Sequence, residues 1–250
     1  HTFTPETPRA VLHRAFSFFL FDENAKMLLT QRAASKITFP NVWTNTCCSH
    51  PLHGMIPNEV DQGDTAHPVF PGIKQAALRK CKQELGINLG QYVSDLTDDI
   101  QFVTKFHYWA ADTVTYGKET VWGEHEVDYI LFLQLPTQIP VNPNSEEVQT
   151  YKWVSLDELK HMMKGDDDEH KDLLWSPWFR GIMDRGGWDW WADMEGTLAG
   201  KYTNDKVTFF EPPAEHYASY NLHSHSRQTG VLSSTSATAT PALTTAKSTN

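Results

Sequence analysis

The alternation of apolar and polar positions predicts five strands in this chain. Residues 15–22 (AFSFFLFD) and 26–32 (KMLLTQR) are predicted to form a hairpin, with residues 23–25 as the turn. Three longer strands are predicted at 102–111, 126–135 and 149–154. In the second of these, Val127, Tyr129, Leu131 and Leu133 lie on one side, because side chains alternate between the two faces of a strand.

Three segments carry helix signals. Pro71 suits a first helical turn and Gly86 a position just past a helix end, which predicts a helix over 71–85. Ser155 and Glu158 are spaced as a capping box at the start of another helix. A third helix is predicted to begin at Ser176-Pro177 and run to about residue 191, with a weak point at Gly186-Gly187.

Strands and helices alternate without a strict repeat, which favours an α/β fold with a mixed sheet and helices on its faces. We expect residues 1–195 to form one domain and residues 33–70 within it to be irregular. Residues 196–225 are ambiguous and are interpreted as a C-terminal extension packed loosely on the domain. Residues 226–250, mostly Ser, Thr and Ala, are predicted to be a disordered tail.

Composition narrows the class of function. A net charge of −10 argues against nucleic acid or an anionic membrane as the main partner, since both require a basic face. No apolar run approaches the ~20 residues needed to span a membrane. Three cysteines do not form a disulfide framework and fit a reducing compartment, cytoplasmic or in an organelle such as the plastid stroma. Because the chain begins at His1 without Met, an upstream targeting segment is an open expectation, and the oligomeric state is open too.

Two short clusters carry candidate chemistry. The run Asn45-Thr46-Cys47-Cys48-Ser49-His50-Pro51 places a thiol two residues from an imidazole. The run Trp122-Gly123-Glu124-His125-Glu126-Val127-Asp128-Tyr129 places two carboxylates on one face of a strand. Together they offer a proton donor, a base and several metal ligands, which is typical of an enzyme site.

The predicted helix also contains a degenerate phosphate-associated motif. Its end, RKCKQELGI at 79–87, resembles the Nudix box R-E-U-x-E-E-x-G-U, in which U is aliphatic and the helix glutamates hold a divalent cation. Lys80 and Gln83 replace two of those glutamates, and Pro71 stands where an earlier one is expected. On spacing alone, Lys80 and Glu84 form an ordinary i,i+4 ion pair. Glu84 remains as one carboxylate that could share a Mg²⁺ with a diphosphate.

These motifs together resemble type I isopentenyl-diphosphate isomerases, a family of Nudix-fold enzymes. The resemblance runs from about residue 1 to 191 and includes LHRAFS at 12–17, QRA at 31–33, KITFP at 36–40 and SPWF at 176–179. It implies a Nudix-type α/β/α sandwich with a mixed β-sheet. It also implies reversible isomerisation of isopentenyl diphosphate to dimethylallyl diphosphate through a tertiary carbocation, with a small-molecule substrate as the partner.

The resemblance assigns roles to individual residues. It marks Cys48 and Glu126 as the proton-transfer groups, with Tyr108 beside Glu126 and Trp178 over the substrate hydrocarbon. An isolated Cys is more often a small buried hydrophobe, and both aromatics in isolation are more often core residues. Positive charge nearby, including a metal, can tune a thiol pKa from about 8.5 towards neutrality.

The resemblance also implies two metal sites and a diphosphate site. The first metal site comprises His1, His13, His50, Glu124 and Glu126, a set suited to Zn²⁺, Mn²⁺ or Mg²⁺. His1 is its weakest member, because a terminal residue can be mobile and water can replace it. Glu84 is the expected ligand of a second, substrate-linked Mg²⁺. Arg32, Lys36 and Lys80 align with the diphosphate contacts, although each alone could be an ordinary surface cation.

Two other functions remain open at this point. One is Nudix pyrophosphohydrolase activity on a nucleotide or related diphosphate, which the depleted box disfavours. The other is a non-catalytic metal-binding or scaffold role on the same fold, which would tolerate loss of Cys48.

Overall fold

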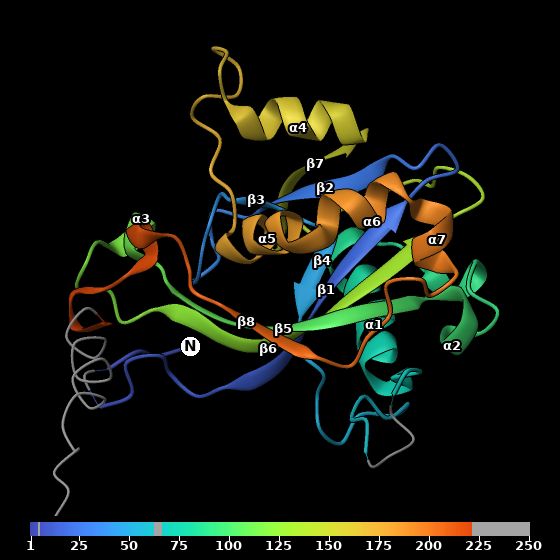
Figure 1. Ribbon diagram of the computed structural model, residues 1–250, viewed down its shortest axis with the longest axis horizontal. Helices are drawn as coiled ribbons and strands as arrows, with labels where there is room; N and C mark the ends of the chain where they lie inside the picture. Colours follow the sequence, from blue (N-terminus) through green and yellow to red (C-terminus); the bar gives the residue numbers. More distant parts are fainter. Residues whose placement is uncertain (5, 63–66, 222–250) are drawn as a thin grey trace, which may run out of the picture.

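The centre of the molecule is one mixed β-sheet (Figure 1). This computed structural model describes residues 1–4, 6–62 and 67–221. The strands are β1 (His13–Phe21), β2 (Met27–Arg32), β3 (Trp43–Thr44), β4 (Cys47–Ser49), β5 (Gln101–Ala111), β6 (Gly123–Gln134), β7 (Val148–Val154) and β8 (Val207–Phe210). Their order is β3-β2-β1-β6-β5-β8, and β4 pairs with β1 while β7 pairs with β2. The β1–β6 and β5–β8 pairs are parallel and the others are antiparallel, so the sheet is mixed as predicted.

Helices cover both faces of this sheet (Figure 1). They are α1 (Pro71–Leu85), α2 (Leu96–Asp99), α3 (Thr113–Tyr116), α4 (Leu156–Lys164), α5 (Pro177–Ile182), α6 (Trp188–Ala192) and α7 (Met194–Leu198). A π-helical turn (Met183–Gly187) joins α5 to α6, and two 3₁₀ turns lie at Leu89–Gln91 and Ala214–His216. Gly86 ends α1 with φ 66°, a left-handed conformation in which a Cβ would be strained.

The helix layers on the two faces of the sheet are held by side chains that alternate along β1. Phe16, Phe18 and Leu20 pack on the same side as the apolar stripe of α1. Phe19 and Phe21 point the other way, towards α4–α7 and their tryptophans. Because both faces of β1 are buried, its sequence is a nearly continuous apolar run rather than an alternation. The resulting α/β/α sandwich is the predicted fold class.

The predicted elements are confirmed, with boundaries that differ by at most three residues. Ser155 and Glu158 form the predicted capping box at α4. The weak point at Gly186-Gly187 is real, because Arg185 and Gly186 leave helical geometry inside the π turn. The segment 33–70 is less irregular than predicted, since it contains β3 and β4. Strands of two and three residues are too short to give a periodic sequence signal.

The C-terminal extension is part of the sheet, which the expectation of loose packing did not anticipate. Its strand β8 lies parallel to β5, with Phe210 opposite Tyr108. The two rings stack at a centroid distance of 5.5 Å and an interplanar angle of 6°. A Cβ at Gly181 would come within 2.4 Å of the Phe210 ring, so α5 approaches this strand closely. The predicted boundary at residue 195 falls inside α7, and the predicted tail 226–250 lies outside the described residues.

Within the part of the chain that the structure describes, each helix is too short or too polar to cross a membrane.

Candidate active site

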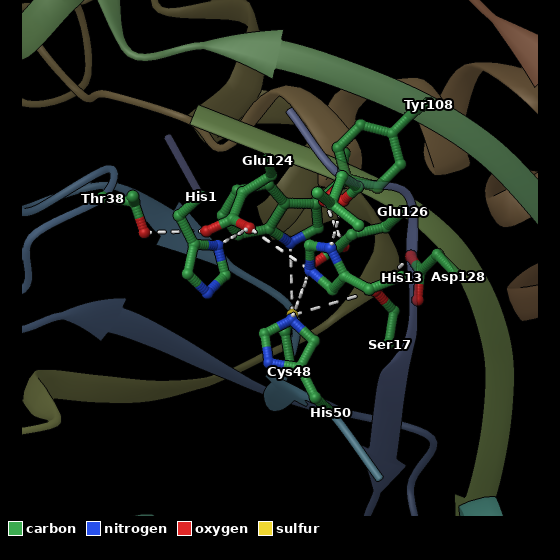
Figure 2. Close-up of polar contacts among 12 residues, drawn as sticks. His1, His13, Ser17, Thr38, Cys48, His50, Tyr108, Glu124, Glu126 and Asp128 are labelled. Atoms are coloured by element: carbon green, nitrogen blue, oxygen red, sulfur yellow. Dashed lines mark hydrogen bonds and ion pairs between the residues drawn. The ribbon is translucent and has the colours of Figure 1, made fainter. Parts of the chain in front are cut away.

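Strand register gathers the predicted chemistry on one face of the sheet. Glu126 on β6 lies between His13 on β1 and Tyr108 on β5, its partners in the two neighbouring strands. Cys48 on β4 lies opposite Ser17 on β1. Since side chains two residues apart share a face, the carboxylates of β6 and the thiol of β4 converge from segments far apart in sequence (Figure 2).

The predicted metal ligands form a compact group. One ligand atom from each of His1, His13, His50 and Glu124 lies within 4.8 Å of the others. Glu126 joins them, with its Oε1 2.9 Å from His50 Nε2 and 3.5 Å from His13 Nε2. His13 and His50 face each other at 3.1 Å between their Nε2 atoms. Three converging imidazoles and two buried carboxylates fit a divalent cation.

His1 is held in place by backbone pairing. Its carbonyl accepts a hydrogen bond from Gly123 N at 3.1 Å, and Thr2 forms a bridge with Trp122. Phe3 packs so closely on Gly123 that a Cβ there would lie 2.2 Å from its ring, which explains the glycine before Glu124. His1 Nδ1 then lies 2.6 Å from Glu124 Oε2. These contacts place His1 within the group, and its role as a ligand stays a prediction.

The carboxylates of Glu124 and Glu126 favour positive charge on the histidines of this group. The hydrogen bond with Glu124 raises the pKa of His1. Burial opposes the charged form of His13, but its hydrogen bonds with Glu126 and the Val11 carbonyl, together with the charges of Glu126 and Glu124, outweigh burial and raise its pKa to about 9. Burial likewise opposes the ionised form of Glu126, yet hydrogen bonds from His13 and His50 lower its pKa. Tyr108 donates a further hydrogen bond to Glu126 Oε2 at 2.5 Å.

Polar groups surround the Cys48 thiol, among them Thr44 Oγ1 at 3.8 Å from the sulfur. The thiol donates to Asn45 Oδ1 at 3.1 Å, and the Asn45 amide is fixed by donating to the carbonyls of Phe18 and Cys47. Trp178 Nε1 donates to the sulfur at 3.2 Å. Ser17 Oγ lies 3.8 Å from the sulfur and donates to Asp128 at 2.7 Å. The thiol is therefore oriented by protein groups on several sides.

Cys48 differs in one respect from the expectation of a thiol tuned towards neutrality. Burial, followed by the charge of Asp128, raises its pKa to about 12. Hydrogen bonding by Ser17 and the charge of Arg32 oppose this rise only in part. The protein groups around Cys48 therefore favour its neutral thiol form.

The predicted diphosphate residues line the same cavity as Cys48 and Glu126. Lys80 pairs with Glu84 at 2.8 Å, so the ordinary i,i+4 ion pair does exist, but it is largely buried. Glu147 lies between the two lysines, 2.5 Å from Lys36 Nζ and 3.6 Å from Lys80 Nζ. Arg32 donates to the Thr38 and Phe39 carbonyls and places its guanidinium 5.6 Å from the centre of the Trp178 ring.

A cavity of about 480 Å³ joins these groups. The predicted residues that line it are His1, Arg32, Lys36, Cys48, His50, Lys80, Glu84, Tyr108, Glu124, Glu126 and Trp178. His13 reaches the same group through its contacts with His50 and Glu126. The structure thus brings every predicted site residue together.

Several residues with clear roles here were missed from sequence. Thr38 donates to Glu124 Oε1 at 2.8 Å and orients that ligand. Arg79 pairs with the buried Glu59 at 2.6 Å and also donates to the His50 carbonyl at 3.0 Å, which fixes the loop that carries His50. Glu147, the counterion of the lysines, follows a loop with no recognisable motif. Arg79 could have been identified from its position as the first residue of the Nudix-like run at 79–87.

Comparison with known proteins decides the family. A NUDIX domain model matches residues 11–175. The isopentenyl-diphosphate delta-isomerase of Schizosaccharomyces pombe is 44% identical over 187 residues, covering 75% of this chain and 73% of that protein. The chain belongs to the isopentenyl-diphosphate delta-isomerase family.

A relative from another organism agrees with this assignment. The enzyme of the same name from Dictyostelium discoideum is 43% identical and covers 74% of this chain and 70% of its own. Among solved structures, a Nudix hydrolase from M. smegmatis is similar with a TM-score of 0.42 and 14% identity, covering 79% of this chain and 93% of that one. Nudix domains generally bind divalent metals, and the histidine–carboxylate group described above is suited to one.

Proposed function

We propose that this protein catalyses the reversible isomerisation of isopentenyl diphosphate to dimethylallyl diphosphate in isoprenoid biosynthesis. One observation carries the proposal: a thiol and a carboxylate, Cys48 and Glu126, line the same cavity as three cations suited to a diphosphate. A substrate held by its diphosphate at the cationic end would extend its hydrocarbon towards these two groups. The family membership supports the same reaction.

The reaction needs an acid and a base on opposite faces of the alkene. Protonating an isolated alkene creates a tertiary carbocation, and removing a proton from the neighbouring methylene completes the shift of the double bond. Cys48 and Glu126 supply the two proton-transfer groups, and Tyr108 holds Glu126 by a hydrogen bond. Because the reaction is reversible, the two groups exchange roles with its direction.

The carbocation must be stabilised without being exposed to water. Trp178 is buried beside Cys48, where its ring can face the cation. Such a contact contributes about 2 kcal/mol when it is desolvated. Exclusion of water also strengthens the electrostatic contacts and prevents capture of the cation.

Two divalent ions complete the proposed site. His1, His13, His50, Glu124 and Glu126 would hold the first, as Zn²⁺, Mn²⁺ or Mg²⁺, which supplies positive charge that fixes Glu126. Glu84 would bind a Mg²⁺ only together with substrate, since one carboxylate leaves most of its octahedron to phosphates and water. Arg32, Lys36 and Lys80 bind the remaining diphosphate charge.

Pyrophosphohydrolase activity is the main rival. It requires a group of helix carboxylates that position several metal ions, whereas α1 presents Lys80 and Gln83 where the Nudix box has glutamates.

The free thiols of Cys47, Cys48 and Cys81 suit a reducing compartment such as the cytoplasm or an organellar stroma.

One assay tests the proposal. The protein is incubated with isopentenyl diphosphate and Mg²⁺, and the products are separated. Formation of dimethylallyl diphosphate that disappears in Cys48→Ala supports the isomerase. Release of phosphate without the isomer would instead support the hydrolase, and no reaction with intact metal binding would support a scaffold.

A further inference from the structure

A second group of metal-ligating side chains lies at the C-terminal end of α4, separate from the residues of the catalytic cavity. It consists of His161, Asp167 and His170, called the α4 cluster below. One ligand atom of each lies within 4.8 Å of the others. His161 stands on the last turn of α4, whereas the other two residues belong to the loop that leads to α5. This loop and helix stand beside β7 in Figure 1.

Asp167 is the centre of the cluster. Its Oδ2 lies 2.7 Å from His161 Nε2 and 2.8 Å from His170 Nδ1. The backbone N–H groups of Glu169 and His170 donate to its Oδ1, both at 2.9 Å. The carboxylate is therefore held in place by the loop backbone before any ligand arrives.

The neighbouring acids are neutralised differently. Asp166 pairs with Lys164 at 2.5 Å, and Asp168 pairs with Lys171 at 2.6 Å. Glu169 lies 3.8 Å from Lys152 and also 3.8 Å from His170 Nε2. Among the described residues, Asp167 is the one acid in this run of four that pairs with two imidazoles. The two imidazole partners distinguish Asp167 from Asp166 and Asp168, which pair with lysines.

We propose that the α4 cluster is a further divalent-metal site, outside the catalytic cavity, that prefers Zn²⁺ over Mg²⁺. Two imidazoles and one carboxylate are the donors that Zn²⁺ favours, whereas Mg²⁺ favours oxygen alone. Glu169 lies 3.8 Å from His170 Nε2, so a small side-chain movement would give the outer hydrogen bond that commonly orients a ligating histidine.

The present geometry is close to what such an ion requires. Ligands at about 2.0–2.2 Å from a tetrahedral Zn²⁺ lie roughly 3.4 Å from one another. The carboxylate and imidazoles now touch at 2.7 and 2.8 Å, so they would separate by about 0.6 Å to admit the ion. Water can complete the coordination, because His161 has 58% of its side chain exposed.

A metal here would join α4 to the segment before α5. That segment is anchored further on, where Trp43 N donates to Leu174 O at 2.7 Å and Ser176 N donates to Trp43 O at 3.0 Å. The ion would therefore stabilise the connection that delivers Trp178 to the catalytic cavity, without itself touching the cavity.

Equilibrium dialysis with Zn²⁺, followed by metal analysis, tests the site on the full chain. His161→Asn should bind one Zn²⁺ fewer per chain than the wild type, or bind that ion about 10-fold or more weakly. Zn²⁺ should raise the Tm of the wild type more than that of His161→Asn, while Mg²⁺ should not distinguish the two proteins. Because the readout is a difference of one ion, it does not depend on whether the catalytic metal site is correctly assigned.

Matched variants separate this site from general attraction to acids. Asp167→Asn should lose the ion, and Asp168→Asn, which alters the adjacent acid, should keep it. His53→Asn removes an exposed histidine outside both clusters and should also keep it. Circular dichroism checks that each variant is folded. Equal Zn²⁺ content in the wild type and His161→Asn, or equal loss in Asp168→Asn and Asp167→Asn, would overturn the proposal.

Discussion

Ser17 donates its hydroxyl hydrogen to Asp128 Oδ2 at 2.7 Å, and Asp128 Oδ1 is buried with no hydrogen-bond partner among the described residues. Ser17 is thus the one recorded hydrogen-bond donor to this carboxyl group in the described structure. Asp128 lies two residues after Glu126 on the same face of β6, so the pair lies directly beside the proposed proton-transfer groups.

Ser17→Ala should therefore destabilise the protein. It removes the hydroxyl from a fully buried carboxyl group, and an unsatisfied buried polar group costs about 1–3 kcal/mol. Urea unfolding measures the loss. Ser35→Ala is the control, because Ser35 is exposed and its removal should change stability by less than about 0.5 kcal/mol. Equal effects of the two substitutions would contradict the importance of the Ser17–Asp128 contact.

Cys48→Ala and Glu126→Gln should each lower kcat by about 10²-fold or more, since each removes a proton-transfer group. Cys47→Ala should retain most activity, because Cys47 is buried on the other face, against the α1 side of the sheet. Steady-state kinetics with isopentenyl diphosphate, together with circular dichroism, makes the comparison. Similar losses at Cys47 and Cys48 would mean that the catalytic thiol is wrongly assigned.

The two proposed catalytic ions should respond to different substitutions. His50→Ala should reduce the metal content of the purified protein, because His50 contacts both His13 and Glu126. Glu84→Gln should leave that content unchanged and weaken Mg²⁺ binding in the presence of diphosphate substrate. Metal analysis of both variants provides the measurement. The reverse pattern would rule out the two-site assignment.

Lys74 should give the protein a distinct pH dependence of stability. It is 1% exposed, and its ammonium donates to Thr97 O at 2.9 Å. Burial lowers its pKa from 10.5 to about 8, against the opposing charges of Asp98 and Asp61. Between these two values the unfolded chain binds more protons than the folded one, so this group makes stability rise with pH.

Lys74→Met should accordingly be more stable than the wild type at neutral pH, and the difference should shrink as pH approaches 10.5. Urea unfolding of both proteins at neutral pH and at pH 10 provides the comparison. Lys82→Met serves as a control, because Lys82 lies on the exposed side of the same helix. A stability difference that does not vary with pH would contradict the lowered pKa.

Local sequence signals predicted much of the site. The alternation of side chains along a strand predicted that Glu124 and Glu126 share a face. The residues at the helix ends predicted the bounds of α1, which carries Lys80 and Glu84. Strand β8 was missed because its residues VTFF follow a polar run and three of the four are exposed. Its partner β5 is distant in sequence, so no local pattern reveals the pairing.

Partners brought in by tertiary folding were harder to predict. Thr38 and Glu147 acquire their roles only when loops from different parts of the chain meet over the sheet. The raised pKa of Cys48 also depends on burial and on Asp128, neither of which can be inferred from the NTCCSHP run alone. The resemblance to the isomerase family identified which residues form the site, whereas their pKa values depend on how the folded chain packs around them.

The position of Phe210 against Tyr108 has a consequence for biosynthesis of the protein. During translation, β5 leaves the ribosome well before β8, so for a time its outer edge has no partner and Tyr108 has no stacking ring. An unpaired strand edge is a template for intermolecular pairing. The nascent chain therefore exposes this edge to intermolecular pairing until β8 emerges, and Tyr108 gains its stacking partner in the catalytic cavity only after β8 has docked.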